Sequence, residues 1–297
     1  MRKPSRRARA ALSLMAAAVL GVAGCDTGGR SAPAPEGTKA RAARPAPVWN
    51  RSPGSIAAVG DSITRGFDAC TVLSDCPEVS WATGSDAQVD SLAVRLLGAA
   101  GAAEHSWNYA VTGARMADLP GQMERAAARD PELVTVMVGA NDACRSSARA
   151  MTSVAGFRAD FEEALRTLRE ASPKTQVYVA SVPNLKRLWS EGRANPLGKE
   201  VWKLGICPSM LSAADDLTSA ATLRRDRVQQ RVVEYNKVLK EVCAKDSRCR
   251  FDNNAVYDYR FGTGQLSHWD WFHPSRDGQA RLAAIAYRTV TAANPVA

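Results

Sequence analysis

This chain lacks the short motifs that mark several common classes of enzyme. It contains no H-E-x-x-H, no Walker loop and no complete G-x-G-x-x-G, which argues against a zinc protease, a P-loop enzyme and a dinucleotide-binding fold. A G-x-S-x-G sequence is also missing, which excludes the nucleophile elbow of the α/β-hydrolases as the source of a reactive serine. Histidine is scarce, and its three copies, His105, His268 and His273, leave few choices for a catalytic base.

An excess of charge of one sign is confined to the amino terminus. The formal net charge is +9, but five basic and no acidic residues lie within the first nine positions, so the rest carries about +4. Because the remaining chain is near balance, we expect no nucleic-acid partner.

The amino terminus is typical of an exported protein. A basic head followed by an uncharged run predicts a signal peptide over residues 1–24. The sequence Val22-Ala-Gly-Cys25 resembles the lipobox of bacterial lipoproteins, in which the cysteine receives the lipid. Residues 25–48 have hardly a bulky apolar side chain, so we expect a disordered tether before one domain over 49–297. The prediction is an extracytoplasmic protein that is lipid-anchored at the cell membrane, or secreted if Cys25 stays free.

The other six cysteines are an even number, which in an exported chain implies disulfides with fifteen possible connectivities. Two pairs of cysteines are each separated by five residues, which favours a disulfide within each pair. The remaining two cysteines then form the third disulfide. A zinc site is the alternative, but the cysteines lack C-x-x-C spacing and a nearby histidine. The favoured set is Cys70–Cys76, Cys243–Cys249 and Cys144–Cys207.

Five short apolar runs alternate with helical patterns along the domain. This alternation predicts a parallel sheet with right-handed crossovers, in a three-layer α/β/α sandwich. The strands are expected at 55–59, 107–110, 133–138, 176–181 and 250–252, and the helices at 87–100, 119–128, 156–171, 217–244 and 276–292. Long connections at 64–86, 143–154 and 183–216 begin at the carboxyl edge of the sheet, where loops shape substrate access. The last of these is either a surface loop held down by its tryptophans or an apolar wall for an acyl chain.

Four fragments in a fixed order carry the strongest signal. The first strand ends in Gly60-Asp61-Ser62, and the later fragments are Asn108-Tyr-Ala-Val-Thr-Gly113, Gly139-Ala-Asn141-Asp142 and Asp270-Trp-Phe-His273-Pro. Together they resemble the four blocks of the SGNH, or GDSL-type, hydrolase family across about residues 55 to 285, most of all its actinobacterial secreted lipase and esterase branch. The resemblance implies a flavodoxin-like α/β fold with a five-stranded parallel sheet.

A serine needs a base within hydrogen-bond reach, and that base needs a third group to orient it. The sequence favours Ser62 as nucleophile and His273 as base, because His273 follows Asp270 by three residues at the position that the family uses, before the last helix. His268 is the competing base, and His105 is expected to be structural.

The resemblance also implies three donors for the negative charge that develops on an ester carbonyl oxygen. They are the backbone N–H groups of Ser62 and Gly113 and the side-chain amide of Asn141. Loss of one such donor is expected to raise the barrier by about 3 kcal/mol. Supporting hydrogen bonds are expected from Asp61, Asp142 and Asn108.

These features predict an exported serine esterase or lipase that acts on a small-molecule ester or a lipid, as a monomer and without metal or cofactor. One alternative is a deacetylase for O-acetyl groups on polysaccharide or cell wall. Another is a lipoprotein that binds lipid or glycan without catalysis.

Overall fold

The computed structural model describes residues 48–294. The expected signal peptide, the expected lipidation site Cys25 and all of the expected tether but Val48 lie outside the described residues.

In the described part of the chain, five parallel strands form one sheet in the order β2-β1-β3-β4-β5, as the sequence predicts for an α/β sandwich. This is the flavodoxin order, in which ligands bind outside the carboxyl ends of the strands, where the order reverses beside β1 and β3. The strands are β1 (Ile56–Gly60), β2 (Ser106–Asn108), β3 (Leu133–Met137), β4 (Gln176–Val179) and β5 (Cys249–Phe251).

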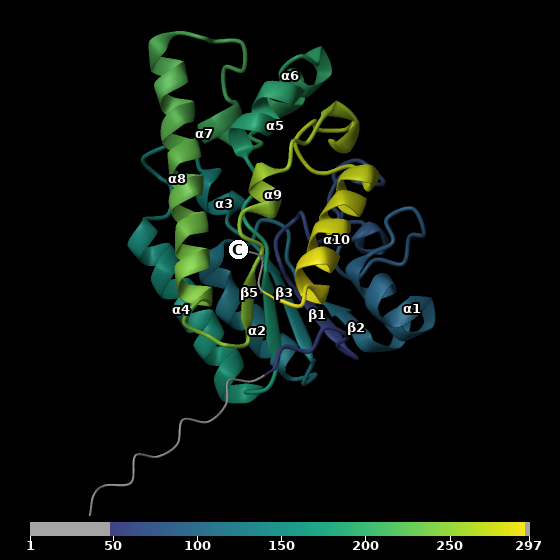
Figure 1. Cartoon of the computed structure of the whole chain (residues 1–297). Helices are drawn as coiled ribbons and strands as arrows, with labels where there is room; N and C mark the ends of the chain where they lie inside the picture. Colours follow the sequence, from purple (N-terminus) through teal and green to yellow (C-terminus); the bar gives the residue numbers. More distant parts are fainter. Residues whose placement is uncertain (1–47, 295–297) are drawn as a thin grey trace, which may run out of the picture. The chain divides into compact units, whose positions relative to one another are not determined.

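The longer helices cover both faces of the sheet, with α1 and α10 on one face and α2, α4 and α8 on the other (Figure 1). No helix among the described residues is long and apolar enough to cross a membrane. The longer helices are α1 (Leu92–His105), α2 (Leu119–Ala127), α4 (Val154–Ala171), α8 (Ser219–Cys243) and α10 (Arg276–Thr291). The shorter ones are α3 (Ala140–Ala143), α5 (Leu185–Gly192), α6 (Pro196–Trp202), α7 (Pro208–Leu211) and α9 (Ala255–Asp258), with 3₁₀ turns η1 (Pro77–Val79), η2 (Met116–Asp118) and η3 (Thr263–Gln265).

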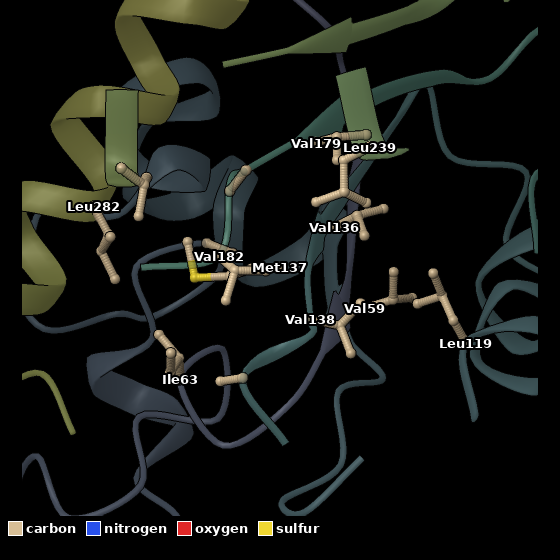
Figure 2. Close-up of a cluster of buried hydrophobic side chains, with 14 of the residues drawn as sticks. Val59, Ile63, Leu119, Val136, Met137, Val138, Val179, Val182, Leu239 and Leu282 are labelled. Carbon is tan, nitrogen blue, oxygen red and sulfur yellow. The ribbon is translucent and has the colours of Figure 1, made fainter. Parts of the chain in front are cut away.

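The core consists of side chains that alternate between the two faces of the central strands. In Figure 2, Val136 of β3 lies toward Leu239 of α8, whereas the next residue, Met137, lies toward Leu282 of α10. All four are at most 1% exposed. This two-residue alternation in a sheet covered on both faces explains why β1, β3 and β4 are apolar along almost their whole length.

Helix starts follow local capping chemistry. Ser91 accepts a hydrogen bond from the backbone of Val94, so α1 begins at Leu92 rather than at residue 87 as the sequence pattern predicts. This helix also runs on past residue 100 to His105, after a break at Gly98, where φ is 71°. Serine or threonine side chains cap α4, α8 and α10 in the same way.

The 183–216 connection is built from the short helices α5, α6 and α7 and is not an irregular loop. Its tryptophans are buried, since Trp189 is 8% and Trp202 is 3% exposed. Both indole N–H groups donate to backbone carbonyls, that of Trp189 to Ala214 at 3.1 Å and that of Trp202 to Asp270 at 2.7 Å. The sequence left two interpretations of this segment, a loop held down by its tryptophans or an apolar wall for an acyl chain. The two tryptophans fit the first.

The structure of residues 48–294 contains three disulfides, and they are the pairs that cysteine spacing favours: Cys70–Cys76, Cys144–Cys207 and Cys243–Cys249. The Cys144–Cys207 bridge joins the end of α3 to the start of α7 across 63 positions of sequence. It therefore ties the 183–216 segment to the loop that follows Asn141.

Candidate active site

The end of β1 is held in a conformation that only glycine allows. Gly60 has φ of 148°, and a Cβ at this position would lie 2.2 Å from the carbonyl oxygen of Met137. The side chain of Gln122 in α2 accepts from the Gly60 N–H at 2.7 Å and donates to its carbonyl at 3.0 Å. The chain leaves the sheet directly after this clamp, which places Ser62 at the carboxyl edge.

Ser62 lies against His273, although the two are 211 positions apart. The hydroxyl oxygen of Ser62 is 2.9 Å from Nε2 of His273, and Nδ1 of the same ring is 2.5 Å from Oδ2 of Asp270. The other carboxylate oxygen, Oδ1, accepts from the backbone N–H groups of Phe272 and His273, both at 2.9 Å. Asp270 is thus fixed by its own turn, and it directs the imidazole at the serine.

The charges around the imidazole favour its protonated form. Burial would lower the pKa of His273, but the carboxylates of Asp270, Asp68 and Asp61 outweigh burial and raise the pKa above its ordinary value. Burial would likewise raise the pKa of Asp270, but the facing His273 and the backbone N–H donors hold it below its ordinary value. The pair therefore stabilises an imidazolium–carboxylate contact.

The other two histidines lie elsewhere. The His268 ring packs against the neighbouring Trp269 at a centroid distance of 4.3 Å, and His105 is an exposed residue beside Glu104. The structure brings His273 to Ser62, as the sequence favours.

Gly113 and Asn141 border the same cavity as Ser62 and His273. Gly113 has φ of 85°, and a Cβ there would meet nothing within 4 Å, so the backbone itself faces open space. Within the described part of the chain, the backbone N–H groups of Ser62 and Gly113 have no acceptor. The Asn141 amide donates one hydrogen bond, to the Ala114 carbonyl at 3.0 Å, and its second N–H remains for a ligand.

Asn108 joins the loops around the serine. Its amide donates to the Thr64 carbonyl at 3.0 Å, and its side-chain oxygen accepts from the Ala110 N–H at 3.1 Å. Asp61 accepts from the Ile63 N–H at 3.0 Å. All three are hydrogen bonds between a side chain and the backbone of a loop, which is the kind of contact that the sequence analysis expects of Asn108 and Asp61.

Asp61 and Asp142 are buried carboxyls, each with one oxygen that has no hydrogen-bond partner among residues 48–294. Asp142 uses its other oxygen to accept from the Met116 N–H at 2.9 Å. Burial raises the pKa of both groups, that of Asp61 to about 7.

Several supporting contacts carry no sequence signal. Gln279 of α10 donates to the Ile63 carbonyl at 2.8 Å and accepts from the Trp81 N–H at 2.9 Å. The ring of Phe67 packs on that of His273 at a centroid distance of 5.0 Å. Like Gln122 and Trp202, these residues act across long sequence separations and belong to no local motif.

The cavity beside Ser62 has a volume of about 200 Å³. Its walls are mostly apolar and come from α5, the 205–207 segment and Phe272. The Cys144–Cys207 disulfide forms part of the wall, whereas neither Trp189 nor Trp202 does.

Two clusters among the described residues bring three potential metal ligands within 4.8 Å of one another. In the first, Cys70 and Cys76 are joined in a disulfide, which leaves no thiolate for a metal. The second cluster consists of Asp68, Asp270 and His273. In it the ring nitrogen Nδ1 of His273 is already hydrogen-bonded to Asp270.

The family model described as GDSL-like Lipase/Acylhydrolase matches residues 56–286. The fold is similar to that of a Parabacteroides merdae protein that carries the description GDSL-like lipase, at 17% identity and a TM-score of 0.49, covering 84% of this chain and 100% of that one. It is also similar to that of an extracellular lipase from Streptomyces rimosus, at 16% identity and a TM-score of 0.42. This match covers 80% of this chain and 99% of the lipase. A third similar structure is a family 3 carbohydrate esterase from Clostridium thermocellum, at 13% identity and a TM-score of 0.47. This match covers 79% of this chain and 93% of the esterase. No curated protein matches the chain.

Proposed function

The chain belongs to the GDSL-like lipase/acylhydrolase family and is a carboxylic ester hydrolase, and on that premise we propose that Ser62, His273 and Asp270 catalyse the hydrolysis of short-chain esters outside the cytoplasm. The observation that carries the catalytic assignment is the continuous contact from the Ser62 hydroxyl through both nitrogens of His273 to Asp270.

In the proposed reaction the Ser62 oxygen attacks the carbonyl carbon of the ester while its proton passes to Nε2 of His273. The carbonyl electron pair moves onto the oxygen, which the N–H groups of Ser62 and Gly113 and the Asn141 amide stabilise. The bond to the alcohol then breaks, and His273 returns the proton to the departing oxygen. Water repeats the two steps on the acyl-enzyme and releases the acid.

The size of the cavity supports a short acyl group. Its volume is about 200 Å³, and an apolar cavity of about 150 Å³ holds one benzene molecule. An acyl chain of up to about eight carbons is comparable in size with this cavity. A longer chain would extend beyond this cavity, and we propose that the added carbons gain less from burial there.

We expect the rate to depend on acyl length. In a series of nitrophenyl esters, kcat/KM should be highest from about two to six carbons and should fall beyond about eight. The Ile206→Ala variant removes part of a cavity wall and should move the optimum toward longer chains. Leu204→Ala is the matched control, because Leu204 is 79% exposed and does not line the cavity. A wild-type optimum at twelve or more carbons would contradict the short-acyl assignment.

The Asn141 amide is proposed as the side-chain donor to the oxyanion. Asn141→Ala should lower kcat by about 10²- to 10³-fold with little change in KM, because the donor acts mainly in the transition state. Asn141→Asp should lose at least as much, since a carboxylate repels the developing charge. Full activity of the aspartate variant would rule out this role.

Removal of O-acetyl groups from polysaccharide or cell wall is a second candidate, and the small cavity favours it as well. Acetate release from acetylated polysaccharide, compared with hydrolysis of nitrophenyl acetate, separates the two functions. Faster turnover of the polymer at equal acetyl concentration would favour the deacetylase.

Export and lipid anchoring complete the proposal. Its support is the basic and apolar amino terminus, the lipobox-like Val22-Ala-Gly-Cys25 and the three disulfides, which persist in oxidising compartments. We propose that residues 25–48 connect a lipid-modified Cys25 to the catalytic domain.

A further inference from the structure

A third carboxyl group lies beside the Asp270–His273 pair and belongs to none of the four sequence fragments. Asp68 follows the serine by six positions, in the connection between β1 and α1, and is 1% exposed. One of its carboxyl oxygens, one oxygen of Asp270 and one ring nitrogen of His273 lie within 4.8 Å of one another. The imidazole therefore has two acidic neighbours in this cluster.

The backbone of Asp68 is fixed from two sides. Its N–H donates to the Ser74 carbonyl at 3.0 Å, inside the loop that the Cys70–Cys76 disulfide closes. Its carbonyl accepts from the Ser267 hydroxyl at 2.6 Å, and the Ser267 N–H donates to the carbonyl of His273 at 2.7 Å. Asp68 is thus connected, through one serine, to the residue whose charge it faces.

The connection contains two residues whose backbone has a positive φ, which residues other than glycine rarely adopt. Asp68 has φ of 56° and Leu73 has φ of 51°. The Leu73 N–H donates to Oδ1 of Asp68, so two left-handed residues together present this carboxyl group. Such conformations cost free energy and are found where the surroundings enforce them, often at functional sites.

The second oxygen of Asp68, Oδ2, has no hydrogen-bond partner among residues 48–294. A buried carboxylate with one oxygen that lacks a donor is costly unless an opposite charge compensates it. The His273 imidazolium that forms during turnover would supply that charge. Burial and the charge of Asp270 raise the pKa of Asp68 to about 6, and the Leu73 N–H and His273 oppose this rise.

We propose that Asp68 is a positioning residue for the general base: its buried carboxylate acts with Asp270 to stabilise the protonated form of His273. The inference rests on the proposed function only in giving His273 the role of base. It also gives the Cys70–Cys76 loop a part in catalysis, because that loop holds the Leu73 donor.

The groups that bear on the titration come from three segments. Asp270 precedes α10, Asp68 lies in the connection after β1, and Asp61 directly follows β1. An ionised Asp68 raises the pKa of His273. Removing this charge should therefore lower the pKa of His273 and leave Asp270 and Asp61 as its acidic neighbours.

The test is Asp68→Asn, measured by NMR titration of the His273 ring and by the pH profile of kcat/KM. Asparagine keeps an oxygen for the Leu73 N–H and tolerates left-handed φ better than other side chains. The pKa of His273 should fall by about one unit, and the acid limb of the profile should move to lower pH by the same amount. The plateau should fall on the order of threefold, because the base is weaker.

Glu78→Gln is the control, since it removes one negative charge from an exposed position near the same loop and should leave both readouts unchanged. A folded Asp68→Asn protein with an unshifted His273 pKa would overturn the inference. If this variant does not fold, the inference can be tested by an NMR pH titration of the wild-type protein labelled with ¹³C in aspartate. The Asp68 carboxyl carbon should show a second inflection at the pKa of His273, and a single-step curve would contradict the coupling. The NMR readouts need no turnover. If the wild-type protein hydrolysed no ester but Asp68→Asn still lowered the pKa of His273, only the proposed function would be refuted.

Discussion

Replacing Ser62 with alanine should lower kcat by on the order of a million-fold and leave the fold unchanged. The hydroxyl oxygen is the atom that the proposed mechanism joins to the acyl group, and among the described residues it is the hydroxyl in contact with Nε2 of His273. Its side chain makes one hydrogen bond, to His273, so its loss removes little of the packing. Hydrolysis of nitrophenyl acetate and a thermal melt measure the two effects.

The matched control for that variant is Ser85→Ala, an exposed serine outside the cavity, which should keep the wild-type rate. A Ser62→Ala protein that retains more than a hundredth of the wild-type kcat would mean that the nucleophile is a different group.

The Asp270→Asn variant should lose about 10⁴-fold in kcat. Oδ1 of Asp270 accepts from two backbone N–H groups, so the amide oxygen of asparagine should take this position. The NH₂ group would then face Nδ1 of His273, which could only accept. The proton would reside on Nε2, and the ring could no longer take a proton from Ser62.

The geometry of Asp270→Asn can be checked separately from its rate. The variant should keep the turn, because both backbone donors still have an acceptor, and ¹⁵N NMR should show a neutral ring with the proton on Nε2. Asp277→Asn is the control, since Asp277 lies in α10 and forms a half-exposed ion pair with Arg281. A loss below tenfold in Asp270→Asn would show that another group orients the histidine.

The sequence predicts the sheet, and it predicts which distant residues meet at its carboxyl edge, because both depend on local patterns. The central strands β1, β3 and β4 are largely apolar runs buried on both faces, and the four fragments follow strand ends or precede the last helix. Since parallel strands bring their carboxyl ends to one edge, residues that are distant in sequence, such as Ser62 and Asn141, border one cavity.

The parts that the sequence does not predict depend on contacts between distant segments. Asp68 is an ordinary loop aspartate in the sequence, and only the fold brings it beside Asp270. Gln122 and Trp202 support the site through hydrogen bonds to backbone atoms, which no side-chain pattern encodes. The helices α6 and α7 have seven and four residues, too few for a helical period to stand out.

His273 and Asp270 are proposed to make the Ser62 hydroxyl a nucleophile. Reaction of the folded protein with a fluorophosphonate, followed by mass spectrometry of its peptides, is the sharpest test of that role. We expect one label per chain, on Ser62, that is absent in Ser62→Ala and forms far more slowly in Asp270→Asn. A folded wild-type protein whose Ser62 stays unlabelled, or that carries the label on another residue, would contradict it.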